Sequence, residues 1–177
     1  MRRFLDRLYA ASGALAALCL AAIAVVMLAN AGMRTAGVLF RGADEITGWL
    51  GAAACFLALG HTFRHGELVR VGLWLDHLSP RGRWAFEIWA LLITFCFSGY
   101  MLWAVTSFVY GNWQDKYVTQ GLLVIPLWMP QVSLIAGILI FLVAVGDELV
   151  LVLRKQKPTY QVAEEERRAA GDFSETV

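Results

Sequence analysis

Four long stretches of this 177-residue sequence contain no Asp, Glu, Lys or Arg, and they constrain the fold more than any other feature. They are Leu8–Met33, Ile46–Phe63, Ile88–Gln114 and Tyr117–Gly146. An α-helix rises about 1.5 Å per residue, so about 20 residues cross a hydrocarbon core of about 30 Å. Strands of a membrane β-barrel would instead alternate polar and apolar residues. The sequence therefore predicts an all-α membrane protein with four transmembrane helices.

The overall composition agrees with a membrane protein. The chain is 59% hydrophobic and 16% charged, whereas soluble domains average about 45–50% and about 25%. A net charge of +1 gives no basic field for nucleic acid, so no nucleic-acid partner is expected. Cys19, Cys55 and Cys96 lie singly in apolar runs, which is not the spacing of a disulfide framework or a zinc site.

The expected spans are about 8–33, 46–63, 88–111 and 127–149. Pro126 and Pro130 mark the start of the fourth, because proline is tolerated in the first turn of a helix. Residues 1–157 then form one membrane domain, and residues 158–177 form a polar cytoplasmic tail. Ala29-Asn30-Ala31 resembles a signal-peptide cleavage site, but the apolar run before it exceeds the usual 7–15 residues. We therefore expect the first span to be retained.

The distribution of basic residues predicts the orientation. Twelve of the fifteen Lys and Arg residues lie before the first span, between the second and third, or after the fourth. The other three are Arg34, Arg41 and Lys116. Basic residues are enriched in cytoplasmic loops, so both termini are expected in the cytoplasm (N-in, C-in).

Residues 66–78 predict a short cytoplasmic interfacial helix between the second and third spans. Leu68, Val71 and Trp74 fall on one helical face, with polar residues opposite. A basic amphipathic helix beside a membrane lies in the interface, although a turn packed under the bundle is the alternative. The residues expected to anchor this region are Arg64, Arg70, Trp74, Arg81, Arg83 and Trp84.

Two further features are candidate contact sites. The second span carries the small residues Gly48, Gly51, Ala52, Ala54 and Ala58, and small residues let membrane helices approach closely. They predict either packing within the chain or an interface to a second membrane subunit. Asp44 and Glu45 precede the same span; they either complement the helix dipole or help to dock a periplasmic partner.

No catalytic, cofactor-binding or metal site is predicted. An ionisable residue near the membrane midplane marks a transport pathway by default, and no span has one. Small drug–proton antiporters also have four helices, but they need a carboxylate in the first span, which is absent here. His61 and His65 are four apart on one helix, whereas a bis-histidine haem usually takes ligands from two helices. The sequence therefore predicts a non-enzymatic accessory subunit of a larger membrane protein complex.

The order of short motifs resembles the small membrane subunit of the tripartite ATP-independent periplasmic (TRAP) transporters. The motifs are Arg34, Asp44-Glu45, Gly51-Ala52-Ala53-Ala54, Arg64-His65-Gly66, Val69-Arg70-Val71, and Ile125-Pro126-Leu127-Trp128 with Pro130 and Gly137. The similarity covers roughly Arg34–Glu148. The sequence departs from the family pattern at Leu68 and Gly72, where His and Asp are often found.

This resemblance implies a place in the bacterial inner membrane and two protein partners. One is a large multi-span subunit that holds the substrate and ion sites, and the other is a periplasmic solute-binding protein that delivers an organic acid. The small subunit would brace the large one, with an ion gradient, usually of sodium, as the energy source. The alternative reading is a haem- or quinone-linked membrane anchor of a respiratory enzyme.

Overall fold

The structure, a computed structural model, describes residues 2–65 and 80–154, and these residues form four long α-helices. Helix α1 spans Arg2–Thr35, α2 spans Ala43–Arg64, α4 spans Pro80–Gln114 and α5 spans Trp128–Leu153. All four are long and apolar enough to cross a membrane, which confirms the predicted all-α architecture with four candidate spans. The interfacial helix expected at 66–78 and the tail at 158–177 lie outside the described residues.

The helices are longer than the charge-free runs that predicted them. Helix α1 begins at Arg2 rather than near residue 8, and α4 begins at Pro80 rather than near residue 88. The backbone hydrogen bonds of a helix continue past the first charged residue, and long basic side chains reach from a helix end to the membrane surface. Pro130 lies in the first turn of α5, as its missing N–H permits.

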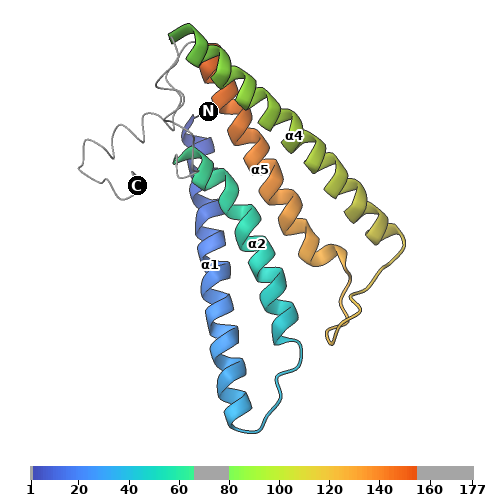
Figure 1. Ribbon diagram of the computed structural model, residues 1–177. Coiled ribbons are helices and arrows are strands. Elements are labelled where there is room, and N and C mark those ends of the chain that lie inside the picture. Colours follow the sequence, from blue (N-terminus) through green and yellow to red (C-terminus); the bar gives the residue numbers. More distant parts are fainter. Residues whose placement is uncertain (1, 66–79, 155–177) are drawn as a thin grey trace, which may run out of the picture.

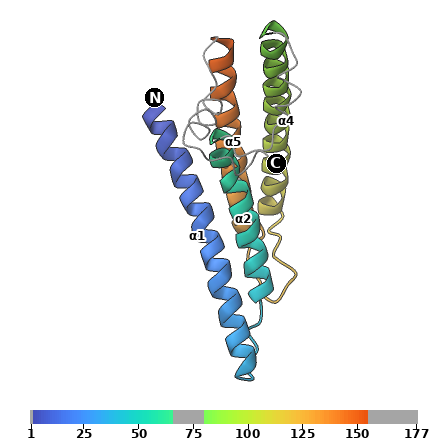
Figure 2. The same ribbon diagram turned by 60° about the vertical axis from the view of Figure 1, so that its left-hand side comes forward.

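The four helices form an open row rather than a closed bundle (Figures 1 and 2). The order in the row is α1, α2, α5, α4, and each helix packs mainly against its neighbours in that order. We call the end that holds Arg64, Pro80 and Leu153 the terminus end, and the end that holds the 36–42 and 115–127 connections the loop end. Helices α1 and α4 splay apart towards the loop end (Figure 1).

Small residues bring α1 and α2 close together. The Ser12 hydroxyl, which is buried, donates to the Leu57 carbonyl oxygen at 2.6 Å. Beside it, Ala16 packs in a buried cluster with Ala53 and Leu57. Lipid tails cannot accept a hydrogen bond, so the serine hydroxyl is satisfied by the neighbouring helix instead. This bond holds the two helices in one register.

Glycine allows an equally close approach of α2 and α5. A Cβ atom built on Gly137 would lie 2.5 Å from both the carbonyl carbon and the oxygen of Phe56. One turn further along each helix, a Cβ on Gly60 would lie 2.8 Å from Cγ2 of Ile140. The two backbones therefore touch at this crossing, which only glycine permits.

All four helices contribute to one apolar core at the terminus end. Its buried members are Tyr9 of α1, Phe63 of α2 and Leu91 of α4, with Val145 and Val152 among those from α5. Contacts also continue towards the loop end; for example, the Asn112 amide of α4 donates to Gln131 Oε1 of α5 at 3.0 Å. The described cluster that draws on all four helices thus lies at the terminus end.

Many large apolar side chains lie on the outward surfaces of the row. Leu18, Leu28 and Phe97 expose 65%, 74% and 66% of their surface. Exposed apolar surface of this extent is unfavourable in water but is the normal surface of a helix in lipid. The four helices are therefore suited to a bilayer, with α1 and α4 each leaving one side free of any neighbour in the described part of the chain.

Candidate functional site

The terminus end holds an ionic cluster centred on Arg64, the last residue of α2. Its guanidinium pairs with the Asp6 carboxylate of α1 and lies 3.9 Å from Oδ2 of Asp147 on α5. The guanidinium carbon also lies 5.0 Å from the centre of the Tyr9 ring, a cation–π distance. The Arg64 side chain is only 15% exposed. This residue, predicted as an interfacial anchor, therefore joins three helices of the row.

Among the other predicted anchors, the structure describes the side chain of Trp84. Its indole Nε1–H donates to the Val152 carbonyl oxygen at 3.1 Å and so ties the start of α4 to the end of α5. The residue remains 41% exposed. Arg70 and Trp74 lie outside the described residues, and so do the side chains of Arg81 and Arg83.

At the loop end, Glu45 holds the connection between α4 and α5. Its carboxylate oxygens accept the backbone N–H groups of Leu122 at 2.5 Å and Leu123 at 3.1 Å. A Cβ on Gly121 would collide with that carboxylate, so glycine makes room for the clamp. Charge-assisted hydrogen bonds are among the stronger ones, and this pair fixes a loop to α2 that is remote from it in sequence.

Asp44, its neighbour in the predicted acidic pair, behaves differently. It lies in the first turn of α2 and is exposed. No ion pair or hydrogen bond engages its side chain within the described residues. The helix N-terminus favours its negative charge, and the carboxylate remains accessible at the surface of the loop end. Of the acidic pair, Glu45 thus binds the 115–127 connection, whereas Asp44 is exposed.

The small residues of α2 differ in how closely the rest of the chain packs against them. Ala54 is buried, and Ala58 packs against the cluster of Ala16, Ala53 and Leu57 on the α1 side. Gly48 and Gly51 have nothing within 4 Å of the position where a Cβ would stand. Ala52 is half-buried. Ala54 and Ala58 therefore pack within the chain, whereas a side chain at Gly48 or Gly51 would meet no other described atom.

The two described histidines lie next to each other on α2. Their ring centroids are 4.1 Å apart, and the Nδ1 of His65 is 2.9 Å from the His61 carbonyl oxygen. The His61 ring packs where Gly13 of α1 leaves space, because a Cβ there would lie 2.8 Å from Cγ of the ring. Within residues 2–65 and 80–154 no group of three or more His, Cys, Asp or Glu side chains could hold a metal ion.

Two of these contacts were not anticipated from the sequence. The cluster around Arg64 depends on Asp6 and Asp147, which lie far apart in sequence and resemble ordinary charged helix ends. Asp147 and Arg64 both fall where their helices approach the same membrane surface, and that shared depth was the available signal. Ser12 gave no signal, because an isolated serine in an alanine-rich span is common in membrane helices.

Comparison with known families gives one match over most of the chain. Residues 23–155 match the family model described as tripartite ATP-independent periplasmic transporters, DctQ component. The matched range takes in all of α2, α4 and α5 and the second part of α1. It also contains Glu45 with its loop partners and Arg64 with Asp147, whereas Asp6 and Tyr9, the α1 partners of Arg64, precede it. No curated protein sequence matches the chain significantly.

Proposed function

The chain belongs to the DctQ family, the small membrane component of TRAP transporters, and on that premise we propose that it braces the large membrane subunit while that subunit carries an organic acid inward. The family confirms the resemblance drawn from the sequence motifs. It also makes the chain a non-enzymatic transporter subunit of the bacterial inner membrane. Coupling to a sodium gradient, delivery by a periplasmic binding protein and the class of cargo are parts of the proposal.

The position of charge along the helices is the observation that supports this role. The described Asp, Glu, Lys and Arg residues gather near the helix ends: Asp6, Arg34, Asp44, Arg64 and Asp147 are typical. A carrier needs polar or ion-binding groups near the bilayer midplane, often on broken helices. Helices α1, α2, α4 and α5 run unbroken through their candidate spans. Substrate and coupling ions are therefore assigned to the large subunit.

The contacts between helices favour a static scaffold over a moving part. Arg64 joins α1, α2 and α5, and Trp84 joins α4 to α5, so the terminus end is held by polar contacts as well as by its apolar core. The Gly137–Phe56 backbone contact leaves no space for α2 and α5 to slide. Packed interfaces of this kind resist continuous deformation, which suits a support for a neighbour that moves.

The orientation belongs to the same proposal. Twelve of the fifteen basic residues belong to the sequence segments that precede, connect or follow the spans at the terminus end. By the positive-inside rule, we therefore assign this end to the cytoplasm. The loop end faces the periplasm. Exposed Asp44 is the residue of the acidic pair that remains able to attract a periplasmic partner, and Gly48 and Gly51 offer a close approach to a helix of the large subunit.

Reconstitution tests the proposal. Proteoliposomes that hold this chain, its cognate large subunit and the binding protein should accumulate one of a panel of labelled dicarboxylates, 2-oxo acids or sugar acids under an inward sodium gradient. Vesicles without this chain should not. Uptake by this chain alone, or full uptake without it, would contradict the proposed role. Substituting potassium for sodium in the gradient tests the coupling ion separately.

A further inference from the structure

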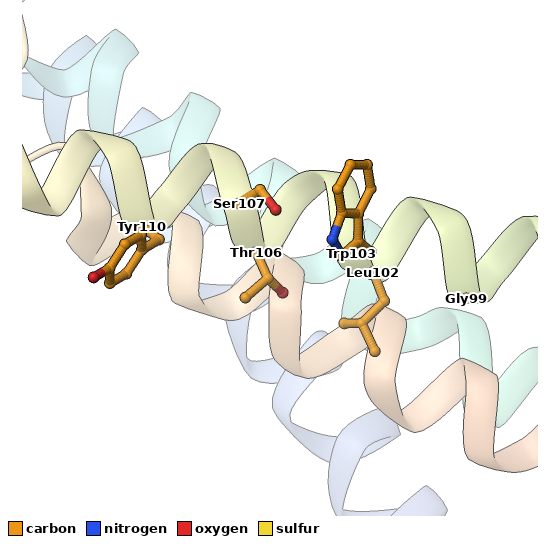
Figure 3. A pocket seen from close by; sticks show the side chains of 6 residues that line it. All are labelled: Gly99, Leu102, Trp103, Thr106, Ser107 and Tyr110. Atoms are coloured by element: carbon orange, nitrogen blue, oxygen red, sulfur yellow. The ribbon is translucent and has the colours of Figure 1, made fainter.

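We propose that a transmembrane helix of the large TRAP subunit packs along one face of α4, in a groove between Gly99 and Tyr110. The inference rests on the proposed function for the identity of the partner. The groove has a volume of about 400 Å³, and its lining residues are Gly99, Leu102, Trp103, Thr106, Ser107 and Tyr110. All six belong to α4, spaced as one helical face (Figure 3). No second element of the described chain closes the groove.

The lining of this groove is unusual for a surface that lipid would cover. The candidate span of α4 is Trp84–Gln114, so Gly99 stands at its middle and Thr106 about 10 Å from it at about 1.5 Å per residue. The hydrocarbon core extends about 15 Å to each side of the midplane. Residues 99–107 therefore lie inside it, whereas tryptophan and tyrosine normally gather at the two membrane surfaces.

Several polar groups in this stretch have no partner in the described part of the chain. These are the hydroxyls of Tyr100, Thr106 and Ser107 and the indole N–H of Trp103. By contrast, the Thr94 and Ser98 hydroxyls, earlier on α4, donate to carbonyl oxygens of their own helix at 2.8 and 2.6 Å. Tyr100 and Trp103 expose 64% and 65% of their surface. Polar groups left without partners in hydrocarbon are costly.

A second exposed stripe of α4, on a different side from the groove, has the composition expected of a lipid-facing surface. Ile93, Phe97 and Phe108 lie on one helical face, turned away from both α5 and the groove, and expose 61%, 66% and 61% of their surface. Ala104 lies on the same face. This stripe has no polar side chain, so α4 separates its free surface into an apolar side and a polar, notched side.

The chemistry of the notched side specifies its occupant. The groove carries no formal charge, which fits a partner embedded in the bilayer and does not fit the soluble binding protein or a lipid headgroup. Its hydroxyl and N–H groups require acceptors, which Ser, Thr, Asn or exposed carbonyl groups of another transmembrane helix supply. Gly99 leaves room at the midplane for a close approach of backbones. Lipid tails offer neither acceptors nor a matching shape.

The position of α4 in the row agrees with this assignment. It is an edge helix that packs mainly against α5, so a helix laid in the groove would extend the row by one member without displacing any contact that the structure shows. The aromatic walls, Trp103 and Tyr110, stand on either side of the polar floor. Tryptophan and tyrosine are enriched among the residues that contribute most to protein–protein contacts.

Site-specific photo-crosslinking in the intact complex tests the proposal. A benzophenone amino acid is placed at position 103 in the groove or at position 97 on the apolar stripe, in cells that also make the cognate large subunit. Position 103 should form an adduct with the large subunit, and position 97 should not. An adduct at 103 that contains only lipid, or only a second copy of this chain, would overturn the proposal, as would equal adducts from both positions.

Substitutions give a second readout. Ser107→Leu fills the groove and should reduce the amount of large subunit that co-purifies at least tenfold, whereas the size-matched Ala104→Leu on the apolar stripe should not. Thr106→Val, which removes a hydroxyl and keeps the shape, should cause a smaller loss. Unchanged co-purification with Ser107→Leu refutes the surface. If the unsubstituted chain itself does not co-purify with the large subunit, the proposed function fails instead.

Discussion

Replacing Gly137 with alanine should destabilise the chain through a single methyl group. The added Cβ would lie 2.5 Å from the carbonyl carbon and oxygen of Phe56, whereas carbon atoms in favourable contact stand about 3.5–4.0 Å apart. The α2 and α5 backbones must therefore separate by about 1 Å. Both atoms belong to the backbone of a helix, so no side chain can rotate away. The strain has to be taken up by moving the whole helix pair.

The magnitude follows from the consequences of that separation. Overpacking a filled core typically costs about 1–3 kcal/mol. Here the shift also disturbs the neighbouring contact of Gly60 with Ile140, so we expect about 3 kcal/mol. With the conversion for globular chains of this size, about 2–4 °C per kcal/mol, this amounts to a fall of about 6–12 °C in the melting temperature.

The assay is thermal unfolding of the detergent-purified chain, followed by tryptophan fluorescence and by the loss of monodisperse protein. Gly51→Ala is the matched control, because the same methyl group there meets nothing within 4 Å and alanine is the better helix former. Gly51→Ala should melt at or above the parent temperature. If Gly137→Ala melts with the control, the close α2–α5 backbone contact is refuted.

Three further changes have defined outcomes. Arg64→Gln removes the charge that joins three helices and should cost about 1–3 kcal/mol in the same melting assay; an unchanged melting temperature would show that the cluster contributes nothing. Glu45→Gln weakens the clamp on the 115–127 loop, so the amides of 122 and 123 should exchange hydrogen several-fold faster, whereas Asp44→Asn should leave them unchanged; equal exchange in both variants refutes the clamp. In a background without native cysteines, Asp115→Cys should react with an impermeant thiol reagent added to intact spheroplasts and Lys157→Cys should not, and the reverse pattern would invert the proposed orientation.

The number and type of the long helices were determined by the sequence alone. Hydrocarbon accepts no unpaired backbone group, so only helices and closed β-barrels cross a membrane. Stretches such as Leu8–Met33 lack the polar–apolar alternation of barrel strands and therefore form helices. The start of α5 was equally local, since proline is favoured in the first turn of a helix and kinks or breaks a helix interior. The family followed from the order of motifs such as Asp44-Glu45 and Ile125-Pro126-Leu127-Trp128.

The ends of the helices could be predicted only in part from the sequence. The first charged residue indicates where the hydrocarbon-spanning segment ends, but the helix itself can continue beyond it. Arg2 and Pro80 begin helices that extend beyond the apolar run. The acidic pair shows a similar limit: Asp44 and Glu45 are chemically alike and adjacent, yet one is exposed and the other clamps a loop. Two neighbours on a helix point about 100° apart, and only the surrounding chain decides which one finds a partner.

The order of the helices in the row was decided by tertiary structure alone. Hydropathy gives every span an apolar surface, so it cannot say which side of α4 faces α5, which faces lipid and which is left with unpaired polar groups. Between membrane helices there is little hydrophobic drive, and the choice of neighbour rests on close fit and a few polar contacts. Ser12 with Leu57, Gly137 with Phe56 and Arg64 with Asp6 are such contacts. Each contact joins residues that are distant in sequence, so it forms only when the helices pack together.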